Sequence, residues 1–262
     1  MFRHESISGG KKVVLKYIGG IEAYDFFINL GSVIGSILLI VLYYRKNRSW
    51  KKTAEVYLLA FAILEVGMFA GRLVRGLSYG EEWNIFHIIT QPNGNHFIGR
   101  VLFTMWVFPV LYRAIFRKEK GEWTGYLDLL CVFLAFQHIF NRIACLCEGC
   151  CMGKPYSGIF AFWYRANGKS GAGFSYPVWP VQMFEISGMV ILLILFFALH
   201  TKKKHFADVF SMGFAVCIFL SEFMMDQTGV LLIAGLSVIQ YAAIVLFVTG
   251  IFIHRCFKSR QR

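Results

Sequence analysis

Phe26–Tyr44 reads FFINLGSVIGSILLIVLYY and carries no charged side chain in its 19 residues. A helix needs about 20 apolar residues to cross the hydrocarbon core of a bilayer. The basic stretch RKNRSWKK, residues 45–52, follows immediately. An uncharged stretch of this length with a basic flank is typical of a transmembrane helix that ends in the cytoplasm.

Six more apolar stretches follow along the chain. They are residues 56–70, 97–116, 126–141, 181–199, 209–225 and 230–253. Charged residues make up 16% of the 262 positions and hydrophobic residues 57%, whereas soluble domains carry about 25% charged residues. The sequence therefore predicts an all-α integral membrane protein, a bundle of about seven transmembrane helices in which residues 1–262 form a single polytopic membrane domain.

The positions of Lys and Arg predict the orientation of this bundle. Segments 45–52, 113–120, 202–204 and 255–262 hold 5, 4, 3 and 4 of these residues. Short loops dense in Lys and Arg stay in the cytoplasm, so we expect an outer amino end and a cytoplasmic carboxyl end. The four basic residues of the expected outer N-terminal segment, residues 1–22, run against this rule. Segments 71–96 and 142–180 then form the long outer parts.

The net charge of +12 does not indicate nucleic-acid binding. The basic residues stand in short blocks beside apolar stretches, where they set topology. A nucleic-acid surface would need a basic stripe on a soluble module. We therefore expect the bilayer, and no nucleic acid, as the partner of these charges.

Polar residues concentrate near the outer ends of the apolar stretches. The set comprises Arg72, Arg75, His96, Arg100, Gln137, His138, Asn141, Arg142, Gln182, Glu185, Glu222 and Asp226, and Glu65 lies deeper. A charge at membrane depth costs at least ~2.5–3.5 kcal/mol on insertion scales. Side chains at helix ends can reach out to water. Alternatively, they line a polar cavity open to the outer leaflet, where Arg or His could hold an anionic headgroup.

The most local signal is CLCEGCCMGKP, which begins at Cys145 and also holds Cys147, Cys150 and Cys151. Three interpretations compete. One is a metal site, although the spacing is tighter than the usual two separated pairs. The second is one or two disulfides, which an outer location permits. The third is a tight turn of small residues, with or without a reactive thiol. The other three cysteines, Cys131, Cys217 and Cys256, are expected to be ordinary apolar residues.

Asn141–Pro155, NRIACLCEGCCMGKP, resembles the signature region of the prolipoprotein diacylglyceryl transferase family, closest to a branch with a Gly-Cys-Cys-x-Gly element. Trp179–Glu185, WPVQMFE, resembles a family segment at the head of a transmembrane helix. Weaker similarities follow in order along the chain. They include Tyr24 before the first stretch, AGRLVRGL with Arg72, NHFIG with His96, SEFMMDQ with Glu222, and LSVIQYAAIVLFVTGIFIHR as the last helix.

This resemblance implies a multi-pass transferase of the bacterial plasma membrane that acts in lipoprotein biosynthesis. It would move the diacylglyceryl group of phosphatidylglycerol to a cysteine thiol of an exported prolipoprotein and release glycerol phosphate. No cofactor or metal is implied. By position, His96 would be the base for the thiol, Arg142 would hold the phosphodiester, and Glu222 would complete the catalytic set. The implied substrate-binding residues are Tyr24, Arg72, Glu148, Gly149, Gly153, Gln182 and Glu185.

The sequence also departs from the family pattern. Ile218 stands where the family has a second essential arginine, Cys145 replaces the signature asparagine, and Trp179 and Val181 replace a histidine and a serine. Loss of one phosphate-holding donor can cost ~10²–10³ in rate. Two other interpretations therefore remain. One is a non-catalytic member that binds lipid or lipoprotein, and the other is a thiol-dependent redox membrane protein.

Overall fold

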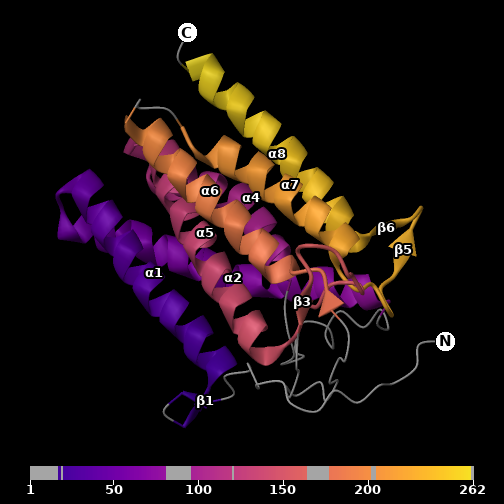
Figure 1. Cartoon of the computed structure of the whole chain (residues 1–262). Coiled ribbons are helices and arrows are strands. Elements are labelled where there is room, and N and C mark those ends of the chain that lie inside the picture. Colours follow the sequence, from indigo (N-terminus) through magenta and orange to yellow (C-terminus); the bar gives the residue numbers. More distant parts are fainter. Residues whose placement is uncertain are drawn as a thin grey trace, which may run out of the picture.

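The computed structural model describes residues 17–18, 20–80, 96–119, 121–163, 177–201 and 205–260. Within these residues, seven helices are long and apolar enough to cross a membrane. They are α1 (Ala23–Asn47), α2 (Trp50–Tyr79), α4 (Phe97–Ile115), α5 (Trp123–Glu148), α6 (Val181–Thr201), α7 (Ala207–Met224) and α8 (Val238–Arg260), and they form one bundle (Figure 1). The predicted all-α bundle of about seven helices is confirmed.

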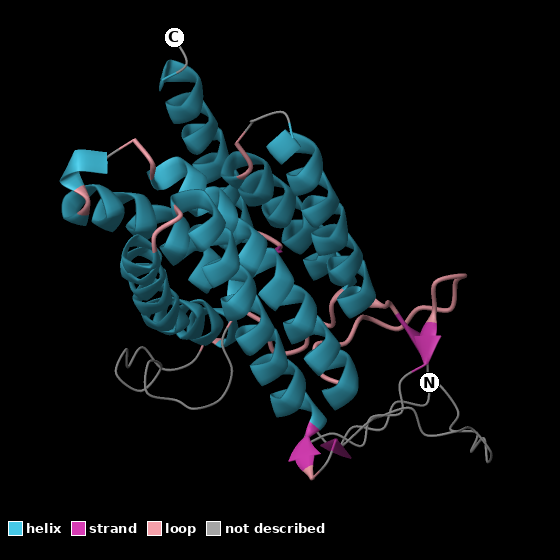
Figure 2. Cartoon of the chain, turned by 90° about the vertical axis from the view of Figure 1, so that its left-hand side faces the viewer, coloured by secondary structure: helices cyan, strands magenta, loops and turns pink. Residues whose placement is uncertain are grey.

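The remaining described elements are short. A 3-10 turn, η1 (Arg117–Glu119), follows α4. Three antiparallel pairs of two-residue strands lie near one end of the bundle (Figure 2): β1 (Tyr17–Ile18) with β2 (Ile21–Glu22), β3 (Phe162–Trp163) with β4 (Pro177–Val178), and β5 (Leu232–Ile233) with β6 (Leu236–Ser237). Residues 168–176 of the expected outer segment 142–180, and the basic block 202–204, lie outside the described residues.

Helix α5 is the central helix of the bundle. It buries a larger share of its apolar stretch than any other of the seven helices and packs on α1, α4, α6 and α7. Its contact with α1 needs glycine, because a Cβ at Gly31 or Gly35 would overlap the rings of Phe140 or Phe133. Small residues let membrane helices approach closely, so these two positions fix α1 against α5.

Two predicted boundaries are wrong. The fourth apolar stretch was expected to end at Asn141, with an outer loop from residue 142, but α5 continues to Glu148. Residues 142–148 contain no Gly or Pro, and the buried charge of Arg142 has a partner, described below. The helix therefore ends only at Gly149, which takes the left-handed conformation at φ 71°.

The last helix begins at Val238 rather than near residue 230. The apolar residues before it form the β5–β6 hairpin, whose turn residues Ala234 and Gly235 both have positive φ. Two such residues form the tight turn that a two-residue hairpin loop requires. Ser237 then caps α8, since Ser237 Oγ accepts the Gln240 N–H (3.2 Å) and Gln240 Oε1 accepts the Ser237 N–H (2.9 Å). This is a capping box.

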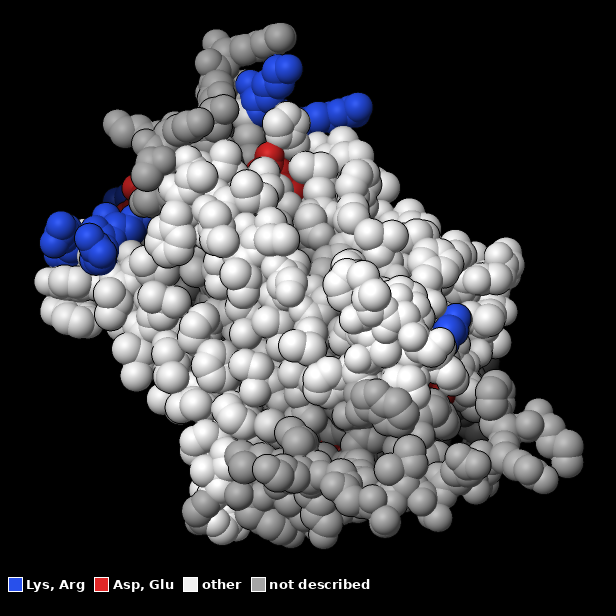
Figure 3. All heavy atoms as spheres, viewed as in Figure 1, with Lys and Arg blue, Asp and Glu red and all other residues white. Residues whose placement is uncertain are grey.

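Dense blocks of basic side chains lie at the end of the bundle remote from the short strands. Figure 3 shows Lys and Arg over the carboxyl end of α8 and around the junction of α1 and α2. The residues there include Arg45, Lys46, Lys51, Lys52 and Lys258. The opposite end holds the amino ends of α1, α4, α6 and α8, and it is the end that carries the Cys-rich turn.

Asp128 of α5 caps α7 across the bundle. Its Oδ1 accepts the backbone N–H groups of Phe206 (2.9 Å) and Ala207 (2.7 Å), and its Oδ2 lies 3.2 Å from His205 Nδ1. The first N–H groups of a helix have no partner within it, and a carboxylate there is favourable for the helix dipole. The bond to Asp128 raises the pKa of His205 above its usual value.

This raised pKa predicts a pH-dependent stability. Below the ordinary histidine pKa of 6.5, His205 is charged in both the folded and the unfolded chain. Its bond to Asp128 then contributes fully to the stability of the folded chain. The contribution is lost as pH rises through the higher pKa of the folded chain. Thermal unfolding in detergent between about pH 5.5 and about pH 8.5 should therefore show a loss of stability that His205→Gln and Asp128→Asn both reduce. An unchanged pH slope in both variants would contradict the assignment.

Candidate functional site

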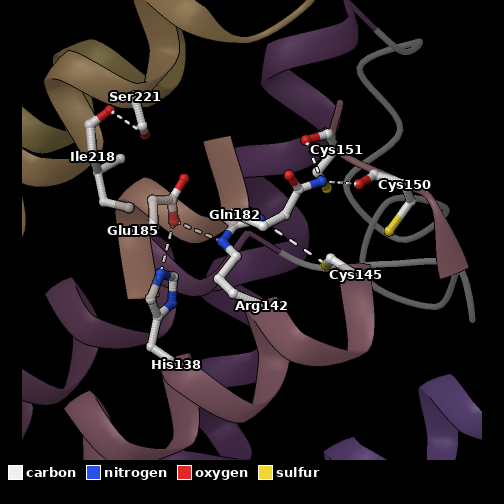
Figure 4. Close-up of polar contacts among 9 residues, drawn as sticks. All are labelled: His138, Arg142, Cys145, Cys150, Cys151, Gln182, Glu185, Ile218 and Ser221. Atoms are coloured by element: carbon white, nitrogen blue, oxygen red, sulfur yellow. Dashed lines mark hydrogen bonds and ion pairs between the residues drawn. The ribbon is translucent and has the colours of Figure 1, made fainter. Parts of the chain in front are cut away.

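A buried carboxylate shared by two bases lies at the strand-bearing end of the bundle. Glu185 of α6 accepts a bond from Arg142 Nε of α5 (2.6 Å) through the same oxygen, Oε2, that lies 2.8 Å from His138 Nε2 (Figure 4). His138 and Glu185 are each 0% exposed and Arg142 is 8% exposed. His138 and Arg142 are four residues apart, so both project from one face of α5.

This arrangement resolves the cost of burying an arginine in the bundle. A buried charge is tolerated when it is paired and hydrogen-bonded. Glu185 binds the guanidinium through Nε, and Nη1 faces the Cys-rich turn. Nη1 of Arg142 lies 4.0 Å from Cys145 Sγ. The arginine is therefore held rigidly by one end while its other end can meet an anion.

The Cys-rich turn follows directly from the end of α5. The N–H groups of Gly149 and Cys150 both bond to the carbonyl of Cys145, at 2.9 and 3.2 Å, which reverses the chain over the last helical turn. The side chain of Gln182, at the start of α6, then donates to the carbonyls of Cys150 (2.7 Å) and Cys151 (2.9 Å). One glutamine thus fixes two successive peptide groups of the turn.

Three sulfur atoms meet inside this turn. The Sγ atoms of Cys145, Cys150 and Cys151 all lie within 4.8 Å of one another, whereas Cys147 is not part of the group. No disulfide joins any of the seven cysteines in this structure. Bonds from Cys145 and Cys150, with the charge of Arg142, lower the pKa of the Cys151 thiol well below its usual range. Bonds with Cys145 and Cys151 raise the pKa of Cys150.

Glu222 of α7 is a third acidic group near the site. Ser237 Oγ, at the head of α8, donates to its Oε2 at 2.8 Å. The carboxylate is buried and interacts electrostatically with Glu185, Arg142 and Cys151. The polar layer therefore draws on α5, α6, α7 and the loop before α8.

Tyr24 and His96 complete the predicted set that the fold brings together. Tyr24, at the start of α1, interacts electrostatically with Arg142 and the three clustered cysteines. His96, just before α4, does so with Cys151, Arg142 and Glu185. Burial lowers the pKa of His96 to about 4. Its imidazole is therefore neutral near pH 7 and free to accept a proton, although only weakly.

The predicted binding residues on α2 and in the turn lie in different settings. Arg72 lies over the ring of Phe69, and Arg75, one turn further along α2, lies over the ring of Tyr79. The charge of Arg75, after that of Arg142, also acts on His96. Glu148 is the last, partly exposed residue of α5. The two glycines shape the backbone. Gly149 has positive φ, and a Cβ at Gly153 would overlap the carbonyl of Trp179.

The replaced positions also fit locally. Ile218 of α7 is buried in the apolar core close to Glu185 (Figure 4), and its carbonyl accepts the Ser221 hydroxyl at 3.0 Å. Trp179 stacks on Tyr156 with ring centroids 3.6 Å apart. Ile218 itself is apolar and brings no charge to this position.

Sequence reasoning did not place His138, Ser237 or the clustered thiols in the site set. The i, i+4 spacing of His138 and Arg142 could have added His138 to the predicted site residues, because two side chains on one helix face can meet the same partner. The Ser-x-x-Gln spacing at Ser237 and Gln240 is a capping signal that could have marked the start of α8. Nothing in the sequence pairs Ser237 with Glu222.

Two comparisons bear on what this arrangement does. The family model for prolipoprotein diacylglyceryl transferase matches residues 12–255. A phosphatidylglycerol–prolipoprotein diacylglyceryl transferase 2 from Clostridium perfringens (strain 13 / Type A) is 25% identical over 264 residues, which cover 96% of this chain and 97% of the relative. The similarity extends across all seven helices.

The shared carboxylate predicts a large stability effect. Glu185→Ala should destabilise the protein by about 3 kcal/mol, because removing one partner leaves a buried charge uncompensated. Glu185→Gln, which keeps the shape and one acceptor, should cost less. Glu55→Ala, at an exposed position of α2, is the control and should stay near wild type. Unfolding in mixed micelles measures all three, and equal stability of Glu185→Ala and Glu55→Ala would contradict the role assigned to Glu185.

Proposed function

The chain belongs to the prolipoprotein diacylglyceryl transferase family, and from that premise we propose how its polar layer carries out diacylglyceryl transfer. The donor is phosphatidylglycerol or a closely similar phospholipid in the outer leaflet. The acceptor is a cysteine thiol of an exported prolipoprotein. The observation that carries the proposal is the arginine held by Glu185, a carboxylate that also meets His138, beside a turn rich in thiols.

The orientation belongs to the same proposal. We place the amino end outside and the carboxyl end in the cytoplasm of a bacterial plasma membrane. Dense clusters of basic residues at the end remote from the site support this, since such clusters stay in the cytoplasm. The polar layer then lies at the level of the outer headgroups, where lipid and exported acceptor both arrive.

Arg142 holds the phosphodiester in this mechanism. Its Nη groups donate to the phosphate oxygens while Glu185 fixes Nε, so the guanidinium needs little rearrangement as charge develops. The acceptor sulfur attacks the glycerol methylene carbon, a C–S bond forms, and the C–O bond to phosphate breaks. The electron pair moves to the phosphate oxygen, which Arg142 stabilises, and glycerol phosphate leaves.

Other side chains position the reactants. Gln182 sets the turn, and Tyr24 and Glu222 bound the space beside Arg142 from α1 and α7. His96 accepts the acceptor's proton. Glu148, Gly149 and Gly153 contribute through the backbone shape of the turn. Glu148 and Gly149 form the end of α5, and Gly153 passes close to the carbonyl of Trp179.

The first test is transfer from headgroup-labelled phosphatidylglycerol to a lipobox peptide. Arg142→Ala should lower the rate ~10²–10³-fold, the usual loss for one donor to a developing oxyanion. Arg142→Lys should retain part of the activity, since the charge remains but the fork geometry is lost. Arg117→Ala, an exposed arginine at the other end of the bundle, should match wild type. Wild-type protein that releases no glycerol phosphate would overturn the proposal.

The second test concerns the cation that replaces the arginine absent at Ile218. We assign this part to Arg75, because its charge reaches His96 and through it the site. Arg75→Ala should reduce kcat about tenfold or more. Arg72→Ala, one turn earlier on α2, should have the smaller effect, because Arg75 and not Arg72 is among the charges that act on His96. The reverse order of the two variants would reassign the second cation to Arg72.

A further inference from the structure

The three sulfur atoms of Cys145, Cys150 and Cys151 form a cluster that the transfer mechanism above does not use. They come from the last turn of α5 and from the reversed chain after it, and all lie within 4.8 Å of one another. A tetrahedral zinc ion binds thiolates at about 2.3 Å, so its ligand sulfurs stand somewhat closer together than this limit. Small side-chain movements would bring the three into coordination.

We propose that Cys145, Cys150 and Cys151 bind one zinc ion and leave its fourth position open for the thiol of the acceptor cysteine. This proposal rests on the proposed transfer function, and it names the group that makes the acceptor a nucleophile. Zinc is the ion that the ligand set favours, because it prefers thiolates, has no redox chemistry and accepts three protein ligands plus one exchangeable ligand.

The backbone of the cluster is held as a metal site requires. Gly149 and Cys150 bond to the carbonyl of Cys145, and Gln182 donates to the carbonyls of Cys150 and Cys151. Cys151 itself has φ 56°, a left-handed conformation that is uncommon for residues other than Gly, Asn and Asp. A cysteine kept in this conformation, with its sulfur turned toward two others, indicates a requirement for that thiol. A turn alone would favour glycine at this position.

Burial and charge also fit an open site. Cys145 is buried, Cys150 partly buried and Cys151 exposed as whole residues, so the cluster lies where the bundle meets its surface. Three thiolates and a divalent zinc carry one net negative charge. Arg142, whose Nη1 lies 4.0 Å from Cys145 Sγ, supplies the neighbouring positive charge.

The chemical step balances without an oxidant or a reductant. The acceptor thiol binds zinc and loses its proton, which passes to His96 or to water. Its sulfur forms the C–S bond at the glycerol methylene carbon as the C–O bond to phosphate breaks. The thioether product, a weaker zinc ligand than a thiolate, then leaves. Arg142 holds the phosphate on the same side of α5, so nucleophile and leaving group are fixed from one helix end.

The first experiment measures zinc in the full-length protein, purified under reducing conditions and supplied with Zn²⁺. Wild type should retain about one zinc per chain. Cys145→Ser, Cys150→Ser and Cys151→Ser should each lose most of it, and the matched control Cys147→Ser, from the same stretch but outside the cluster, should keep it. No zinc in reduced wild type, or equal loss in Cys147→Ser, would overturn the proposal, as would a disulfide within the cluster that persists with zinc present.

The second experiment replaces zinc with Co²⁺ and follows the thiolate-to-cobalt absorption. A lipobox peptide should shift the spectrum, and the same peptide with Ser in place of its Cys should not. A spectrum that neither peptide changes would overturn the proposal of an open coordination position. This readout needs no turnover and therefore separates the metal site from the overall reaction.

Transfer assays then distinguish the two proposals. The Arg142→Ala variant should keep its zinc but lose transfer activity. The Cys151→Ser variant should lose both zinc and transfer activity, and the Cys147→Ser variant should keep both. Metal-free wild type that transfers at the full rate would overturn the zinc proposal and leave the transfer function standing. A cobalt protein that binds the peptide thiol but never releases glycerol phosphate would overturn the transfer function and leave the thiol-binding site standing.

Discussion

The bond network around Glu185 is the constraint on which the rest of the site depends. A guanidinium inside a membrane bundle needs a partner, and Glu185 provides one from the neighbouring helix while it also meets His138. This allows α5 to carry Arg142 below the surface and to continue to Glu148. The end of the helix then delivers Cys145 and the reversed turn directly beside the arginine. Without the carboxylate, neither the position of Arg142 nor that of the turn would be fixed.

The same network explains the pattern of glycines and glutamine in the Cys-rich stretch. Gly149 must be left-handed to end α5 where it does, and Gly153 must lack a Cβ to pass under Trp179. Gln182 ties the carbonyls of the turn to the head of α6, the helix that also carries Glu185. Gly149, Gly153 and Gln182, which the family resemblance implies to be binding residues, therefore hold the backbone of the Cys-rich turn in place. The direct chemistry falls to fewer groups.

Much of the fold could be predicted from the sequence because apolar stretches near 20 residues leave little choice of structure in a membrane. The number of helices and the polar layer of Arg142, Glu185 and Glu222 followed from such stretches and their ends. The end of α5 could not be predicted, since a charged residue normally marks a helix end at the interface, and its partner lies 43 residues away. The β5–β6 hairpin was hidden for a different reason. Its residues are as apolar as the helix that follows, and only Ala234 and Gly235 break the pattern.

The clustering of three thiols could not be predicted from the Cys-x-Cys-x₂-Cys-Cys spacing, because a helix and a left-handed cap must first bring the ends together. Once placed, they address a weakness of the mechanism. A histidine with its pKa lowered to about 4 is a poor base for a thiol whose usual pKa is near 8.5. A metal-bound thiol is deprotonated outright, so a zinc ion on the cluster would remove the need for a strong base. The low basicity of His96 and the presence of the three clustered thiols then have one explanation. Arg142 stabilises the leaving group, and zinc on the cluster activates the nucleophile.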